Sequence, residues 1–100
     1  MASLIWSEKA AADLENIYDF IAADSPFYAK VQIERIVGSA ERLKSFPGSG
    51  RAIPEIPHLP HQELIIGAYR LVYRFDAESE TVYIATVIHS ARLMQNELLE

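Results

Sequence analysis

Two apolar runs near the end of the chain constrain its fold more than any other feature. The first, residues 69–75, alternates apolar and polar side chains with the period of a half-buried strand. A second run follows at residues 81–88, after a polar connector rich in turn-tolerant residues. The two runs predict an antiparallel hairpin. It gathers cationic and titratable side chains, with Arg70 and Arg74 on one face and His89 and Arg92 just beyond its end.

Length and charge limit what the chain can be. One hundred residues, 1–100, are enough for one domain with a modest core. The formal net charge of −5 argues against a surface that binds nucleic acid broadly, and we expect no sequence-specific DNA binding by this chain alone. Residues 51–100 carry four arginines and no lysine, and guanidinium groups suit phosphate or carboxylate recognition.

Several classes of protein are excluded by what the sequence lacks. It has no cysteine, no apolar run near the roughly 20 residues that span a bilayer, and no signal peptide at its start. We therefore expect a cytoplasmic protein without a membrane partner. His58, His61 and His89 have no metal-ligand spacing, so we expect neither a metal nor a cofactor, and we interpret His58 and His61 as solvent-facing loop residues.

The first half of the chain predicts a strand and two helices. Residues 4–6 form a short strand, Ser7 caps a helix that ends near Ala23, and a second helix runs from about Pro26 to about Lys44. Apolar side chains recur at helical spacing in both, at Ala11, Leu14, Ile17, Tyr18 and Ile21, and at Ala29, Ile33, Ile36, Val37, Ala40 and Leu43. The opposite face of the first helix receives Asp13, Glu15, Asn16 and Asp19.

The connections complete the fold prediction. The short link at residues 24–26 makes the helices an antiparallel hairpin. Residues 51–60 form an extended loop or irregular edge, residues 62–66 a strand, and residues 92–100 a short C-terminal helix. The order β-α-α-β-β-β is that of an α+β domain, with the helical hairpin packed on a small, mainly antiparallel sheet. The expected core includes Trp6, Leu71, Tyr73, Val82 and Ile84.

The hairpin arginines admit two chemical interpretations. Cleavage of RNA needs a base, an acid and cations around the phosphate. Glu55 or His89 could serve as base and His89 as acid, with a clamp formed by Arg51, Arg70, Arg74 and Arg92. Alternatively, the arginines form cross-strand ion pairs with acids such as Glu63. Arginine beside Tyr69, Tyr73 and Tyr83 is also typical of a partner-binding surface.

Over nearly its whole length the chain resembles the ParE/RelE superfamily, the toxins of bacterial type II toxin–antitoxin modules. The resemblance is carried by the order and spacing of short motifs: residues 5–7, Ala10 or Ala11 with Asp13-Leu14, Ile17-Tyr18 with Ile21, residues 24–26 with Ala29, residues 43–47, Gly50-Arg51, Pro54-Glu55, Glu63-Leu64, residues 69–73, and Val87 with His89 and Arg92. It implies the fold predicted above.

The branch of the superfamily determines the function that the resemblance implies. The ParE-like branch, which this sequence resembles more, is associated with plasmid stabilisation. It poisons DNA gyrase by binding, so no catalytic residues are expected. The RelE-like branch cleaves messenger RNA on the ribosome, for which Arg70, His89 and Glu55 would be the catalytic set. A non-toxic relic that only binds antitoxin is the third alternative.

The resemblance also implies two surfaces. The target surface is expected at Arg51, Tyr69, Arg70, Arg74, His89 and Arg92. A cognate antitoxin is expected to keep the toxin inactive by burying an amphipathic segment in the apolar groove between the helical hairpin and the sheet, which Phe27, Tyr28 and Val31 are expected to line.

Overall fold

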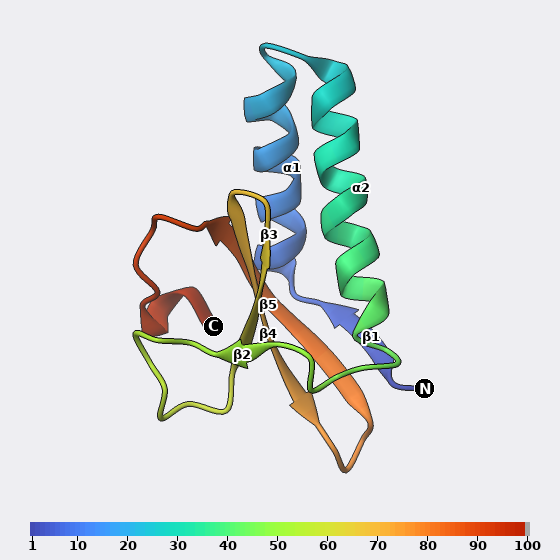
Figure 1. Cartoon of the computed structure of the whole chain (residues 1–100), viewed down its shortest axis with the longest axis vertical. Helices are drawn as coiled ribbons and strands as arrows, with labels where there is room; N and C mark the ends of the chain where they lie inside the picture. Colours follow the sequence, from blue (N-terminus) through green and yellow to red (C-terminus); the bar gives the residue numbers. More distant parts are fainter. Residues whose placement is uncertain (100) are drawn as a thin grey trace.

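The computed structural model describes residues 1–99, and two helices lie on one face of a five-stranded sheet (Figure 1). The helices are α1 (Glu8–Ala22) and α2 (Pro26–Arg42), and a 3-10 turn, η1 (Asn96–Leu99), follows the last strand. The strands are β1 (Ser3–Trp6), β2 (Arg51–Ala52), β3 (Gln62–Ile66), β4 (Tyr69–Asp76) and β5 (Thr81–His89). This is the predicted α+β class with its helical hairpin.

The strand order in the sheet is β1-β5-β4-β3-β2, and only β1 runs parallel to its neighbour. The structure adds β2 to the predicted order, as two residues that pair with β3 inside the segment expected to be an irregular edge. The predicted tail helix is the η1 turn, and Glu100 lies outside the described residues. Neither helix within residues 1–99 is long and apolar enough to cross a membrane.

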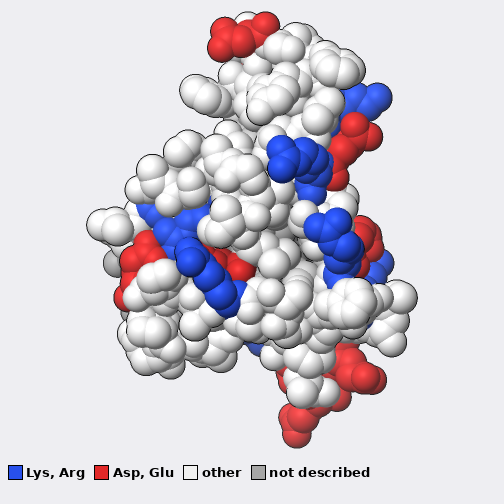
Figure 2. Space-filling view, viewed as in Figure 1, with Lys and Arg blue, Asp and Glu red and all other residues white. Residues whose placement is uncertain are grey.

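Charged side chains are unevenly distributed over the face seen in Figure 2. Carboxylates stand at the tip of the helical hairpin and at the turn between β4 and β5, the two ends of the molecule. Lysines and arginines lie between these ends, in groups over the sheet and along α2. Carboxylates also lie directly beside these cations, over the sheet and along α2, so the middle region of this face carries both charges.

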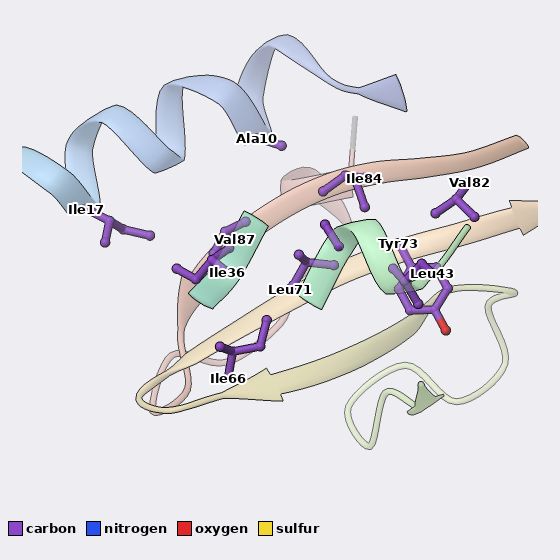
Figure 3. Packing of buried hydrophobic residues seen from close by; sticks show 11 residues of the cluster. Ala10, Ile17, Ile36, Leu43, Ile66, Leu71, Tyr73, Val82, Ile84 and Val87 are labelled. Atoms are coloured by element: carbon purple, nitrogen blue, oxygen red, sulfur yellow. The ribbon is translucent and has the colours of Figure 1, made fainter. Parts of the chain in front are cut away.

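The main core lies between the helices and the sheet (Figure 3). Four of the five residues predicted as core are fully buried there, namely Leu71, Tyr73, Val82 and Ile84, and Trp6 packs against them partly buried. A smaller cluster on the other face of the sheet holds Val72 and Ile88 against the 53–59 connection and the tail residues Met94 and Leu98. The sheet is therefore covered on both faces, by the helices on one side and by the tail on the other.

The buried stripe of α1 differs from the predicted one. Ala10 is fully buried, whereas Ala11 is exposed and Tyr18 is 39% exposed. Ser7 fixes this rotation, because its Oγ accepts a hydrogen bond from Ala10 N at 2.9 Å and donates one to Ala85 O at 2.8 Å. The cap thus ties the first turn of α1 to β5 and selects which of two overlapping apolar stripes faces the core.

Tyr73 joins the sheet to the connection that follows α2. Its hydroxyl donates to Pro47 O at 2.8 Å and accepts from Gly50 N at 2.9 Å. A Cβ on residue 50 would lie 2.6 Å from Tyr73 Oη, so only glycine permits this approach. Burial raises the pKa of the Tyr73 hydroxyl, which therefore stays protonated and able to donate.

Candidate functional site

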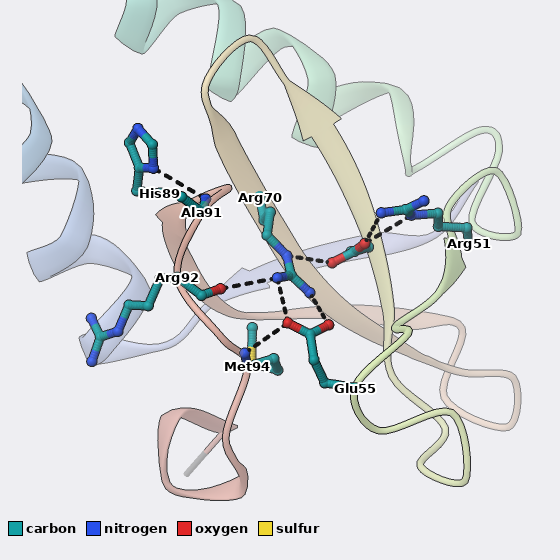
Figure 4. Close-up of polar contacts among 8 residues, drawn as sticks. Arg51, Glu55, Arg70, His89, Ala91, Arg92 and Met94 are labelled. Carbon is teal, nitrogen blue, oxygen red and sulfur yellow. Dashed lines mark hydrogen bonds and ion pairs between the residues drawn. The ribbon is translucent and has the colours of Figure 1, made fainter.

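Arg70 of β4 is 5% exposed and lies at the centre of a group of ion pairs, the Arg70 cluster, formed with Glu55 and Glu63 (Figure 4). Nη1 and Nη2 each donate to one oxygen of Glu55 at 2.7 Å, and Nε donates to Glu63 Oε1 at 2.7 Å. Nη1 also donates to Arg92 O at 3.0 Å. Protein acceptors therefore take up four of the five N–H donors of the guanidinium.

These contacts fix the charge state of the Arg70 cluster. The hydrogen bonds from Arg70, aided by one from Met94 N at 3.0 Å, lower the pKa of Glu55 from 4.5 to about 2. The hydrogen bonds with Glu55 raise the pKa of Arg70 above its usual value. Both groups are charged at neutral pH, and neither is available to exchange a proton there.

The predicted nuclease residues do not come together. Arg70 and Glu55 meet in the cluster, but His89 points to the opposite face of the sheet, because its β4 partner is Tyr69 and successive strand residues alternate faces. Its ring stands edge-on to that of Tyr69, with centroids 5.7 Å apart, and its Nδ1 accepts from Ala91 N at 3.1 Å. The interpretation of Arg70 as an ion-pair partner of Glu63 is the one seen in the structure.

His89 belongs instead to a separate hollow, the histidine pocket, formed by Ile17, Phe20, Tyr69, His89 and Arg92. The pocket has a volume of about 360 Å³ and lies between α1 and the ends of β4 and β5. His89 and Arg92 are exposed, and Phe20 is 78% exposed. Three of the six predicted target-surface residues, Tyr69, His89 and Arg92, therefore gather here.

The remaining predicted residues lie elsewhere. Arg74 is exposed on the face of the sheet away from the helices, with its guanidinium carbon 4.2 Å from the centre of the Tyr83 ring. Arg51 is paired with Glu63 at 2.8 Å on the edge strand β2. In α2, Phe27 and Tyr28 are 77% and 54% exposed, and Val31 is half-buried.

His58 is exposed, as expected, but His61 is partly buried and its Nδ1 has no hydrogen-bond partner within residues 1–99. Burial, with the nearby charge of Arg74, lowers the pKa of His61. In the described part of the chain, no three histidine or carboxylate side chains gather as metal ligands would.

Sequence reasoning missed the role of Asp13, which it placed on the solvent face of α1. Its side chain is only 16% exposed, and its Oδ2 accepts hydrogen bonds from Thr86 Oγ1 at 2.5 Å and Val87 N at 3.0 Å. Lys9 Nζ balances the charge at 3.0 Å. The register of β4 against β5 shifts at this point, so that Val72 pairs with Thr86 but Tyr73 with Ile84. Asp13 therefore supplies an acceptor where the bulge interrupts the ladder.

Comparison with known proteins identifies the family to which this chain belongs. The model of the family described as the ParE toxin of the type II toxin–antitoxin system, parDE, matches residues 4–94, and the chain belongs to this family. It is 31% identical over 93 residues to Toxin RelE2 of Caulobacter vibrioides, an alignment that covers 93% of this chain and 100% of that protein.

Solved structures agree with the family assignment. The chain is 26% identical, with a TM-score of 0.71, to one from the chromosomal ParDE system of P. aeruginosa, over 89% of this chain and 96% of that one. It is 25% identical, with a TM-score of 0.60, to one from the RelBE2 complex of Mycobacterium tuberculosis, over 88% and 96%. A mutant of the E. coli toxin RelE in the free state shares the fold at 17% identity and a TM-score of 0.64, over 98% and 90%.

Proposed function

We propose that this protein is the toxin of a type II toxin–antitoxin module and stops bacterial growth by binding DNA gyrase, not by cutting RNA. The claim that the protein does not cut RNA rests on the Arg70 cluster, whose charged groups are bound to one another. In it, the arginine and the carboxylate that a nuclease of this fold would use are consumed by each other. Such a target implies action in the cytoplasm.

The titratable groups that remain exposed do not form the acid–base pair that RNA cleavage needs. General acid–base cleavage of a phosphodiester needs two titratable groups within reach of the reacting oxygens. The histidine pocket offers His89, and the carboxylate beside it, Asp13, is already bound to Lys9, Thr86 and Val87. Glu55, with a pKa of about 2, is too weak a base and holds no proton to donate at neutral pH. One histidine with a neighbouring cation suits binding better than catalysis.

The same pocket has the features of a protein-binding surface. It combines an exposed aromatic ring, Phe20, with the cation of Arg92 and the polar rings of Tyr69 and His89. Aromatic and arginine side chains carry most of the binding free energy at protein interfaces. We assign contact with gyrase to this pocket, with Arg74 and Arg51 outside the central contact.

The antitoxin is the second proposed partner. The solved relatives come from a ParDE system and a RelBE2 complex, and an antitoxin encoded beside this chain is the corresponding partner here. The exposed aromatic side chains Phe27 and Tyr28, with Val31, form an apolar end of α2 that an amphipathic segment can cover.

A second candidate function is ribosome-dependent cleavage of messenger RNA. It is favoured by the 31% identity to Toxin RelE2 and by the exposed pair of His89 and Arg92 at one pocket. In that case His89 would act alone as the titratable group, with Arg92 as the phosphate contact. A chain that folds and binds antitoxin but inhibits neither gyrase nor translation would be a non-toxic relic of the family.

Assays with purified components distinguish gyrase poisoning from messenger RNA cleavage. Gyrase, supercoiled plasmid and the protein are mixed, the reaction is denatured, and linear DNA is measured. A ribosome–messenger mixture is assayed for cleavage in parallel. We expect linear DNA to accumulate with the wild type. Arg92→Ala should reduce it about tenfold or more, and Lys30→Ala, an exposed cation on α2 outside the pocket, should not. Messenger cleavage without linear DNA would overturn the proposal.

A further inference from the structure

A small hollow of about 170 Å³ lies on the face of the sheet away from the helices, where Arg74 is exposed. We call it the sheet pocket and define it by five of the side chains that line it, namely Ile5, His61, Arg74, Tyr83 and Leu99. It shares none of these residues with the histidine pocket or with the antitoxin surface on α2. None of the functions assigned so far uses it.

Strand register brings four of these side chains into one row across the sheet. Arg74 in β4 pairs with Tyr83 in β5, and Tyr83 pairs in turn with Ile5 in β1. His61 directly precedes β3, whose first residue pairs with Tyr73, so His61 lies at the end of the ladder beside Arg74. Side chains directly opposite each other on neighbouring strands share a face and are within contact distance. An imidazole, a guanidinium, an aromatic ring and an aliphatic side chain therefore adjoin in this row.

The guanidinium of Arg74 has no carboxylate partner. Within the described part of the chain it forms no ion pair and donates no hydrogen bond. It lies over the ring of Tyr83, with its central carbon 4.2 Å from the ring centre. A cation over an aromatic ring is held by the charge distribution of the ring and not by hydrogen bonds. The N–H donors of Arg74 are therefore available to a ligand.

His61 supplies a second polar group to the sheet pocket. Its side chain is partly buried, and its Nδ1 is shielded from water with no hydrogen-bond partner among the described residues. Burial, with the nearby charge of Arg74, lowers the pKa of His61, so the ring is neutral at pH 7 and one of its nitrogens carries a proton. A buried polar atom without a partner is costly, and a ligand oxygen that accepts from Nδ1–H would remove the cost.

We propose that the sheet pocket binds a carboxylate on a short apolar stem. The carboxylate accepts hydrogen bonds from Arg74 and from Nδ1–H of His61, and the stem packs against Ile5 and Leu99. Ile5 is 49% exposed, so the stem covers apolar surface that the protein leaves in water. The inference does not rest on the proposed function, because gyrase binding is assigned to the histidine pocket.

The size and charge of the sheet pocket select this class of ligand. Its 170 Å³ correspond to five or six water molecules at about 30 Å³ each, which is the space of about six non-hydrogen atoms. One guanidinium and one neutral imidazole balance a single negative charge. A phosphate dianion would leave one charge uncompensated against the apolar walls, which is unfavourable. Butyrate matches the pocket in both size and charge.

This chemistry occurs both in a free short-chain acid and in a glutamate side chain of another protein. Butyrate represents the first source. Glutamate with its amino group acetylated and its α-carboxyl amidated represents the second, because it presents the same carboxylate on a two-carbon stem attached to a peptide backbone. Both ligands should bind if the pocket accepts a protein side chain. Binding of butyrate alone would assign it to a free acid.

Nuclear magnetic resonance titration of the full chain at pH 7 and constant ionic strength tests the proposal. Butyrate should shift the ring signals of His61 and the guanidinium signals of Arg74 saturably, with a Kd on the order of 1 mM for so small a ligand. Arg74→Gln should raise the Kd about tenfold or more. Arg42→Gln is the matched control, since it removes the same charge at an exposed position outside the pocket, and it should change the Kd less than about twofold. Shifts that do not saturate by about 50 mM butyrate, or equal effects of the two variants, would overturn the inference.

His61→Phe gives an independent readout. It keeps an aromatic ring but removes the unpaired nitrogen, so the melting temperature should stay the same or rise while the Kd for butyrate rises about tenfold. An unchanged Kd would contradict the role given to His61. Inorganic phosphate is titrated in parallel, and phosphate that binds as tightly as butyrate through Arg74 would overturn the assignment to a carboxylate.

Discussion

Arg70 connects three segments of the chain that are distant in sequence. Its four hydrogen bonds reach Glu63 in β3, Glu55 in the 53–59 connection and the carbonyl of Arg92 in the tail. Charges this far from water are tolerated only when paired, and Arg70 is paired with two carboxylates of which one, Glu63, has a fully buried side chain. Arg70 therefore supports the structure, and an effect of its mutation on toxicity would report folding as much as contact.

Replacing Arg70 should therefore destabilise the fold. Arg70→Ala leaves Oε1 of the buried Glu63 without its donor, with Arg51 as the remaining partner, and is expected to cost about 3–5 kcal/mol of unfolding free energy, measured by urea denaturation. Arg74→Ala is the control, because Arg74 is exposed and should change stability by less than about 0.5 kcal/mol. A stable Arg70→Ala protein would show that the cluster is dispensable for folding.

The pKa of Glu55 predicts how stability depends on pH. A carboxyl whose pKa falls on folding, here from 4.5 to about 2, binds protons more readily in the unfolded chain. Its contribution is complete above about pH 4.5 and is lost as the pH falls towards 2. Unfolding free energy measured across this window should decline, and Glu55→Gln should make the decline shallower. An identical slope in wild type and Glu55→Gln would contradict the assignment.

At the scale of elements, α1 and β5 are joined by polar contacts as well as by the core. The cap at Ser7 and the carboxylate of Asp13 both bond to the part of β5 around its irregularity, Ala85 to Val87. Because His89 follows two residues later, these contacts hold the strand end that forms the histidine pocket. The helix thus positions a surface to which it contributes Ile17 and Phe20.

Loss of the Asp13 carboxylate should loosen this end of β5. Asp13→Ala leaves the buried Thr86 hydroxyl and the Val87 N–H without their acceptor, which is expected to cost about 2–3 kcal/mol and to speed amide exchange at Val87. Asp19→Ala removes a carboxylate from an exposed position of the same helix and should be close to neutral. If both variants exchange alike at Val87, the carboxylate does not support the strand.

The elements show what local patterns could predict. Both helices, the cap at Ser7 and the strands β3 to β5 follow from spacing and turn chemistry, because those signals are local. The two-residue strand β2 is too short to leave a pattern. The burial of Asp13 depends on the irregularity in β5, and that of Arg70 on acids 7 and 15 residues away. Such contacts exist only once the sheet is assembled.

At the scale of the whole molecule, the antitoxin surface on α2 and the histidine pocket are neighbours, because Tyr28 of the first and Tyr69 of the second line one hollow. Exposed arginines lie at the histidine pocket (Arg92), along α2 (Arg35 and Arg42) and on the sheet (Arg51 and Arg74). One chain can therefore offer its target and its inhibitor adjacent sites.

The most direct test of the central claim is precursor incorporation in growing bacteria after sudden induction of the chain without antitoxin. Labelled thymidine and labelled methionine are followed in parallel, with Arg92→Ala beside the wild type. We predict early collapse of thymidine incorporation while methionine incorporation continues, and a delayed collapse in the variant. Early collapse of methionine incorporation would contradict the claim and assign the histidine pocket to the ribosome. If incorporation of both precursors continued, the claim would also fail, and the protein would be one that only binds antitoxin.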